Sequence, residues 1–278
     1  MTKQGKVISF LNMKGGVGKT TLCINIAYSL VRHFNKRVLL IDMDPQFNAT
    51  QALMEKYYST DEYFAFKKQG KSIIKIFEND FSLIDNVDEN KDKKNDLIIS
   101  LTNNFDIVIG DLDLIKVEFG QRGSENLLSD FIENENILGE YDYVLIDCPP
   151  THSFYTSSSL IASNFYLAPL KPDVYSVLGV NLLRHVVANV NKMHKINVKP
   201  LGVVFTMIDP GLVRQNQIVD GLKTKYSNKI SFFENMSYEY EYIASGKMDT
   251  FMYDMVRTKN EISLITKEFI EEIDKNEQ

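Results

Sequence analysis

The sequence predicts an α/β protein with a doubly wound, mainly parallel sheet flanked by helices. Short apolar runs typical of buried parallel strands cover residues 7–11, 38–41, 105–109, 143–146, 165–170 and 198–206. Amphipathic patterns typical of helices cover residues 20–33, 124–137, 173–194 and 258–273. Because strand and helix patterns alternate, we expect parallel strands joined by helices, with ligands bound at the carboxyl ends of the strands.

Composition is consistent with one domain over residues 1–278. The chain has 278 residues, of which 44% are hydrophobic, enough for a substantial core. Residues 55–100 are less regular: aromatic residues interleave with lysines, and a charge-rich stretch at 85–96 is expected to form an exposed loop. We favour a helix at the sheet edge for the aromatic part over a surface for nucleic acid or a partner protein.

Charge and cysteine content restrict the class of protein. The net charge of −6 argues against an overall nucleic-acid binder and against attraction to anionic lipids, but it allows a local basic patch. No apolar run reaches the roughly 18 residues of a membrane span. The first strand is predicted at residue 7, so we expect no signal peptide. With two cysteines outside any metal-type cluster, we expect a cytoplasmic protein with free thiols.

A glycine-rich loop joins the first predicted strand to the first predicted helix. It reads Asn12-Met13-Lys14-Gly15-Gly16-Val17-Gly18-Lys19-Thr20-Thr21. Glycines let backbone N–H groups turn inward around phosphate, and the helix N-terminus adds the positive end of its dipole. Lys19 can reach the β- and γ-phosphates, and the Thr20 hydroxyl can ligate Mg²⁺. The loop therefore predicts an ATP site at residues 14–21.

Carboxylates follow two of the other predicted strands. Asp42 and Asp44 stand at i and i+2, so their side chains are expected to face the same way, toward phosphate and Mg²⁺. We assign Asp44 to the orientation of the attacking water, and Asp42 to the Mg²⁺ hydration shell or to Thr20. Asp147 ends the run at 143–146, the Walker B arrangement in which a carboxylate binds Mg²⁺ directly or through water.

Together these motifs resemble the ParA/MinD family of P-loop ATPases. Lys14 stands where the family's deviant Walker A motif has a signature lysine, and Met13 stands where the generic P-loop has glycine. Residues 44–50 (DPQFNAT) resemble the family's switch I segment, and residues 147–150 (DCPP) resemble its switch II. Further similarity at 168–173, 202–209 and 244–246 extends the resemblance over nearly the whole chain, except residues 55–100.

The resemblance implies a Mg²⁺-dependent ATPase that forms a homodimer when it binds ATP. Lys14 would cross the interface to the partner's nucleotide, joining Lys19 and Asp44 as catalytic residues, while Pro169, Thr206 and Met207 would lie near the base. The ATP dimer would bind DNA non-specifically and become nucleoid-associated. Hydrolysis stimulated by a ParB-like centromere-binding protein would release it, which implies plasmid or chromosome segregation.

DNA contacts follow the family pattern less closely. Many ParA proteins carry an arginine soon after the segment that resembles Thr206-Met207, whereas here the first basic residue after it is Arg214. Acidic and tyrosine residues at 238–242 replace another arginine of the family. The mode of DNA binding is therefore expected to differ. Candidate contacts are Arg184, Lys192, Lys195, Arg214, Lys223 and Lys225.

Three other functions are found on folds of this kind. A MinD-like positioning ATPase would act on a membrane or partner protein, but its branch uses a basic amphipathic C-terminal helix, and residues 267–278 are net acidic. A reductase similar to the nitrogenase iron protein needs two cysteines for an Fe–S cluster, and Cys23 and Cys148 do not match that placement. A bacterial tyrosine kinase has a tyrosine-rich tail, which residues 258–278 lack.

Overall fold

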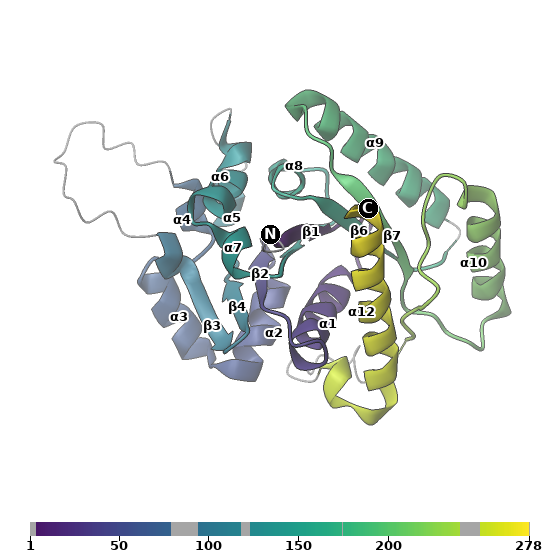
Figure 1. Ribbon diagram of the computed structural model, residues 1–278, viewed down its shortest axis with the longest axis horizontal. Helices are drawn as coiled ribbons and strands as arrows, with labels where there is room; N and C mark the ends of the chain where they lie inside the picture. Colours follow the sequence, from purple (N-terminus) through teal and green to yellow (C-terminus); the bar gives the residue numbers. More distant parts are fainter. Residues whose placement is uncertain (1–3, 79–93, 118–122, 174, 240–250, 278) are drawn as a thin grey trace.

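A seven-stranded sheet forms the centre of the computed structural model, which describes residues 4–78, 94–117, 123–173, 175–239 and 251–277. The strand order is β3-β4-β2-β5-β1-β6-β7, and only the β3–β4 pair is antiparallel. The bounds are β1 (Lys6–Phe10), β2 (Val38–Asp42), β3 (Ile98–Thr102), β4 (Phe105–Val108), β5 (Tyr143–Asp147), β6 (Phe165–Leu170) and β7 (Lys199–Phe205). This architecture, shown in Figure 1, confirms the predicted fold class.

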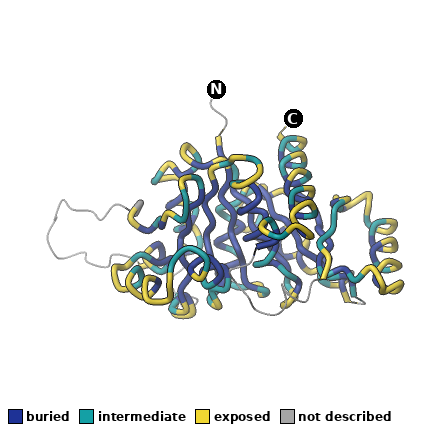
Figure 2. Tube along the Cα trace, turned by 90° about the horizontal axis from the view of Figure 1, so that it is seen from below, coloured by how far each residue is buried: buried dark blue, intermediate teal, exposed yellow. Residues whose placement is uncertain are grey.

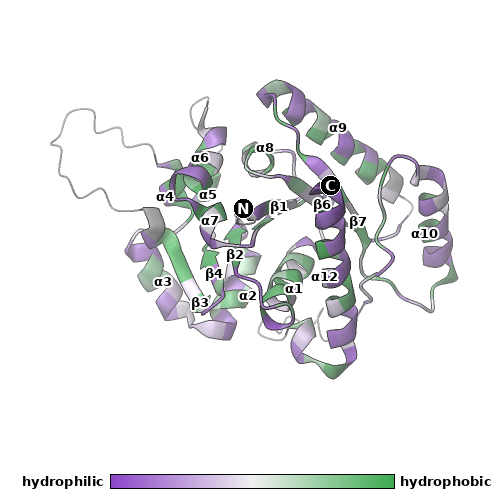
Figure 3. Cartoon of the chain, viewed as in Figure 1, coloured by the Kyte–Doolittle hydropathy of each residue, from purple (hydrophilic) through white to green (hydrophobic). Residues whose placement is uncertain are grey.

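Helices cover both faces of the sheet. One face packs against α1 (Lys19–Arg32), α2 (Asn48–Tyr57) and α12 (Val256–Glu277), which share one buried apolar cluster. The other face packs against α4 (Ile74–Phe77), α6 (Leu127–Asn134), α8 (Phe154–Ile161), α9 (Ser176–His194) and α10 (Val213–Tyr226). Figure 2 shows the buried strands inside this shell, and Figure 3 shows alternating hydrophilic and hydrophobic bands on α9, α10 and α12. Among the described helices, none is long and apolar enough to cross a bilayer.

The segment at 55–100 is more regular than the sequence pattern suggested. Its described part contains α3 (Thr60–Lys68), α4, the 3₁₀ turn η1 (Lys94–Leu97) and the edge strand β3. The aromatic–basic stretch lies in α2 and α3, beside the β3–β4 edge of the sheet (Figure 1). β3 lacked a clear signal because only one of its five residues is buried. Most of the charge-rich stretch at 85–96 lies outside the described residues, as do residues 244–246.

One predicted helix is interrupted in the structure, and three further helical segments were not predicted. The pattern at 124–137 gives a 3₁₀ turn η2 (Ser124–Asn126), α6 and a separate α7 (Ile137–Glu140), because Asn136 adopts a left-handed conformation with φ 51°. The short helix α5 (Leu114–Val117), the 3₁₀ turn η3 (Met252–Asp254) and α10 carried little periodicity. In α10, only Gln215, Val219 and Leu222 are buried.

Candidate nucleotide and metal site

The glycine-rich loop leaves β1 at the carboxyl edge of the sheet and enters α1 at Lys19. Gly16 and Gly18 have φ of 69° and 77°, the left-handed region that favours glycine, so the tight turn needs these residues. The loop backbone can then present N–H groups together with the N-terminus of α1. This arrangement suits a phosphate chain.

Two polar side chains, those of Asn12 and Thr206, hold the loop in place through hydrogen bonds. Asn12 accepts a hydrogen bond from the Lys14 backbone N–H at 2.9 Å and donates one to the Pro169 carbonyl at 2.6 Å. The Thr206 hydroxyl donates to the Val17 carbonyl at 2.7 Å. The loop is thus tied to the ends of β6 and β7 before any nucleotide binds. Sequence reasoning missed Asn12, although its place directly after β1 was a signal.

Lys19 lies buried among acidic groups. Only 7% of its surface is exposed, and burial lowers the pKa of its ammonium, while the nearby Asp147 and Asp44 carboxylates oppose that shift. A buried lysine at a helix N-terminus lacks the solvation that an exposed lysine has. Its charge would therefore be available to a phosphate group. The contact of Lys19 with the β- and γ-phosphates stays a prediction.

Asp147 has a buried carboxylate without a hydrogen-bond partner. Both of its oxygens are inaccessible and unpartnered, and Asp42 stands directly beside it in the β2–β5 register. Burial raises the pKa of Asp147 well above its usual range, Asp42 raises it further, and Thr20 opposes the rise. A bound divalent cation would satisfy these orphaned oxygens, and the Thr20 hydroxyl is a second oxygen donor. These residues fit Mg²⁺, which prefers such ligands.

Replacing Asp147 with asparagine is expected to stabilise the metal-free protein. A carboxyl whose folded pKa is raised favours folding most at low pH, and it costs stability as the pH rises toward that folded value. We therefore expect Asp147→Asn to raise the free energy of unfolding by about 1–3 kcal/mol at pH 8 in a metal chelator. The gain should shrink at pH 5. Urea titrations at both pH values measure it, and a loss of stability at pH 8 would contradict the assignment.

Asp42 is already engaged by the segment that follows it. Its Oδ2 accepts hydrogen bonds from the Thr50 N–H and hydroxyl, both at 2.8 Å, and its Oδ1 accepts one from the Asp44 N–H at 3.2 Å. Burial raises the pKa of Asp42 to about 7. These contacts make Asp42 the anchor of residues 43–50. A part in the Mg²⁺ hydration shell stays a prediction.

Asp44 lies two residues after the end of β2, close to Lys19. It is 6% exposed, and its Oδ1 accepts a hydrogen bond from the Gln46 N–H at 2.9 Å, which closes a tight turn. No described side chain donates a hydrogen bond to its Oδ2. The position is compatible with the predicted orientation of a water molecule, which stays a prediction.

Lys14 forms an ion pair with Asp173, which follows β6 and precedes α9. The Lys14 side chain is 46% exposed, so its ammonium reaches the surface of the loop while Lys19 points inward. Asp173 was not singled out from the sequence. The difference between the two lysines agrees with distinct roles for them.

The predicted base-binding residues contact the loop rather than forming a separate pocket. Pro169 accepts the Asn12 hydrogen bond, and the Thr206 hydroxyl is bound to the Val17 carbonyl. Met207 has φ 54°, and its Cε would lie 3.8 Å from a Cβ placed on Gly18. All three lie next to the loop, and their contact with a base stays a prediction.

The six basic candidates do not form one patch. Arg184 and Lys192 lie on α9, and Lys195 is the C-terminal cap of this helix, which is about 28 Å long. The other three lie on α10: Arg214 and Lys225 line a groove of about 450 Å³ that includes Asp173, whereas Lys223 pairs with Glu234 at 3.6 Å. The α10 groove adjoins Lys14 through Asp173.

The two cysteines are free and buried. Cys23 belongs to the apolar cluster on the α1 side of the sheet, and Cys148 belongs to the cluster on the α9 side. Their thiols therefore face different layers. This placement does not fit the cluster ligation of an iron-protein reductase.

Comparisons with known proteins agree with this geometry. A family described as an AAA domain matches residues 5–199. The sporulation initiation inhibitor protein Soj of Bacillus subtilis is 30% identical over 234 residues, which cover 81% of this chain and 82% of Soj. The chromosome partitioning protein ParA of Myxococcus xanthus is 28% identical over 226 residues, which cover 81% of this chain and 73% of that protein.

A solved structure shows the same fold over nearly the full length. It is a putative plasmid partition protein of Borrelia burgdorferi B31 bound to AMPPNP, with a TM-score of 0.74 and 22% sequence identity. The match covers 97% of this chain and 99% of the Borrelia chain.

Proposed function

This chain belongs to the ParA-type P-loop ATPases, and we propose that it is a DNA-partitioning ATPase that segregates a plasmid or chromosome. The observation that carries the proposal is the pairing of two loop lysines with different environments. Lys19 is buried beside Asp147 and Asp44, whereas the Lys14 ammonium reaches the surface. One lysine can hold its own nucleotide, and the other is free to reach a second subunit once it leaves Asp173.

The proposed hydrolysis uses groups already held in place. The loop N–H groups and Lys19 bind the β- and γ-phosphates, and Asp44 orients water for attack on the γ-phosphate. Asp147 and Thr20 would hold Mg²⁺, which would supply positive charge against the phosphates. The Borrelia partition protein, which has the same fold, was solved with the ATP analogue AMPPNP bound, and this supports ATP as the substrate proposed here. A single ParA-like domain over residues 1–278 is part of this proposal.

Lys14→Ala is expected to bind ATP as a monomer and to fail at dimerisation. The loop and Lys19 still hold the phosphates, but the partner's nucleotide loses a cationic contact. Light scattering with a non-hydrolysable ATP analogue measures the change, with Lys68→Ala, an exposed lysine on α3, as the matched control. If Lys14→Ala forms the ATP dimer as readily as the control, the proposed role in trans is wrong.

The proposed cycle couples dimerisation to DNA. A net charge of −6 weakens DNA binding by a single copy, whereas a dimer brings two sets of basic side chains to one surface. Hydrolysis, stimulated by a ParB-like protein, then releases the DNA. The structure favours Arg214 and Lys225 for these contacts, because their groove includes the Asp173 that holds Lys14.

Charge reversal on α10 is expected to weaken DNA binding and spare ATP turnover measured without DNA. If the dimer neutralises about six phosphates, affinity should fall roughly a thousandfold between about 50 and 200 mM salt, and Arg214→Glu should lower that slope. Arg184→Glu tests the α9 side, and Lys68→Glu on α3 is the control. Unchanged affinity and slope in Arg214→Glu would remove α10 from the proposed DNA surface.

A further inference from the structure

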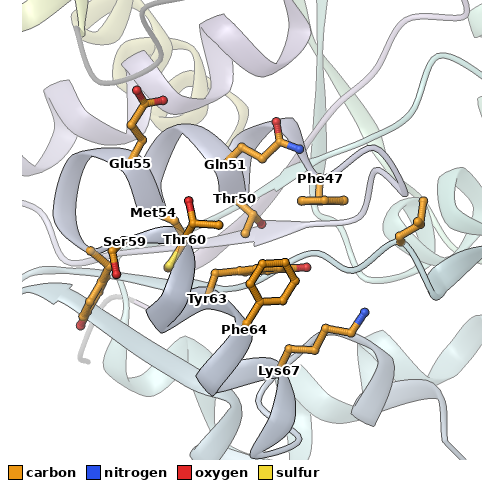
Figure 4. Close-up of a pocket in the computed structure, with 12 residues that line it drawn as sticks. Phe47, Thr50, Gln51, Met54, Glu55, Ser59, Thr60, Tyr63, Phe64 and Lys67 are labelled. Atoms are coloured by element: carbon orange, nitrogen blue, oxygen red, sulfur yellow. The ribbon is translucent and has the colours of Figure 1, made fainter.

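A groove beside the nucleotide site has no part in the reaction described above. Its volume is about 880 Å³, and it lies between α2, α3 and the turn at Leu112. Figure 4 shows Tyr63 and Phe64 at its centre, with Phe47 and Lys67 toward one end. Phe64 and Leu112 line it with 59% and 55% of their surfaces exposed, so large apolar groups face solvent there.

One wall of the groove belongs to the segment that carries Asp44. Phe47 has φ 42°, a left-handed conformation that is costly for a bulky residue, and its N–H donates to the Asp44 carbonyl at 2.8 Å. Its ring stacks on Tyr63 with centroids 5.6 Å apart. Behind it, a Cβ on Gly110 would lie only 2.8 Å from the Phe47 Cβ. Phe47 is therefore held between the groove and the core.

The same segment is fixed at its far end by Thr50. The Thr50 hydroxyl donates to Asp42 Oδ2 and accepts a hydrogen bond from the Gly110 N–H at 2.7 Å. The connection from Asp42, the last residue of β2, to Thr50 in the first turn of α2 is thus held by hydrogen bonds at both ends, with Asp44 and Phe47 between them. The Phe47 N–H and the Asp44 carbonyl are joined by a hydrogen bond, so we expect a group that shifts Phe47 to move Asp44 as well.

Charge at the groove selects among possible occupants. The Lys67 ammonium is already held by Asp111 at 2.6 Å and Asp113 at 3.1 Å. Glu55 is exposed and lines the groove, and no described residue pairs with it. The available charge is therefore negative. This negative charge repels the phosphates of a nucleic acid. It attracts a partner in which a cationic side chain lies next to an apolar side chain.

We propose that this groove docks a peptide segment of a partner protein, in which a large apolar side chain lies next to a lysine or arginine. The apolar side chain packs on Phe64, Tyr63 and Phe47, and the cation pairs with Glu55. Docking changes ATP turnover through Phe47 and Asp44. The inference rests on the proposed ATPase function, and it places the regulating partner at α2 and α3.

A library of random 12-residue peptides displayed on phage tests the groove directly. The library is selected on the immobilised full chain, and enriched peptides are synthesised and titrated by fluorescence anisotropy against four variants. Phe64→Ser and Glu55→Lys change the groove. Leu182→Ser, with 53% of Leu182 exposed on α9, and Glu133→Lys on α6 are the matched controls. Thermal melts check that all four variants fold.

We expect enriched peptides to combine aromatic or aliphatic residues with lysine or arginine. Their affinity should fall roughly tenfold in Phe64→Ser and Glu55→Lys and stay unchanged in the controls. The peptides should also alter ATP turnover of the wild-type chain but not of Phe64→Ser. Enrichment of acidic peptides, or equal binding to Phe64→Ser, would overturn the proposal. Because binding is measured without nucleotide or DNA, its result is separate from failure of the partitioning function.

Discussion

Lys19→Ala is expected to lower ATP affinity by roughly a hundredfold or more, since a buried charge-assisted contact to two phosphates is lost. The structure gives a specific reason for so large an effect. Lys19 is 7% exposed at the N-terminus of α1, with Asp147 and Asp44 close by. Without the ammonium, these carboxylates would face the phosphates with less compensating charge, so repulsion adds to the lost attraction.

Calorimetric titration with ATP and Mg²⁺ measures the affinity of Lys19→Ala. Lys68→Ala is the control, because that lysine is exposed at the end of α3 and lies outside the glycine-rich loop. Lys19→Met keeps more of the side-chain volume and separates loss of charge from loss of packing. ATP affinity within a few fold of wild type in both Lys19 variants would contradict the nucleotide site.

Asp44→Ala is expected to bind ATP and dimerise, but to hydrolyse ATP roughly a hundred- to ten-thousandfold more slowly. The reason is its position: Asp44 lies two residues after the end of β2, and its Oδ1 accepts a hydrogen bond from a backbone N–H of the following turn. Removing it therefore leaves Lys19, Asp147 and the loop intact. The loss should appear in kcat and leave KM nearly unchanged.

Single-turnover phosphate release with pre-bound ATP separates the chemical step from binding in Asp44→Ala. Asp130→Ala, which removes an exposed carboxylate on α6, is the control. Wild-type turnover in Asp44→Ala would make Asp44 a structural residue and leave the water without an assigned side chain.

The parallel part of the fold could be predicted from sequence because its strands are short, continuous apolar runs. β2 and β5 are buried at every position, and their helices repeat apolar residues at helical spacing. β3 could not be predicted in this way. It is an edge strand, mostly half-exposed, that pairs antiparallel with β4 through an irregular register.

Some residues of the candidate site could also be predicted from the sequence, and others could not. The glycine-rich loop could be predicted from its sequence motif, and Asp147 from its place at the end of a strand. In both cases local geometry determines where the groups point. The roles of Asn12 and Asp173 depend on contacts across 157 and 159 residues of sequence, which no local pattern contains. Asp42 shows the same limit: its oxygens are engaged by Thr50, eight residues later, across the turn that leads into α2.

We expect ATP to turn this chain into a DNA-binding dimer. A gel shift with duplex DNA of arbitrary sequence, at about 50 mM salt, tests it most directly when run with ATP, with ADP and without nucleotide. We predict a shift with ATP, little or none in the other two lanes, and loss of the ATP-dependent shift in Lys14→Ala. Equal shifts in all three nucleotide conditions, or no shift in any of them, would contradict the claim.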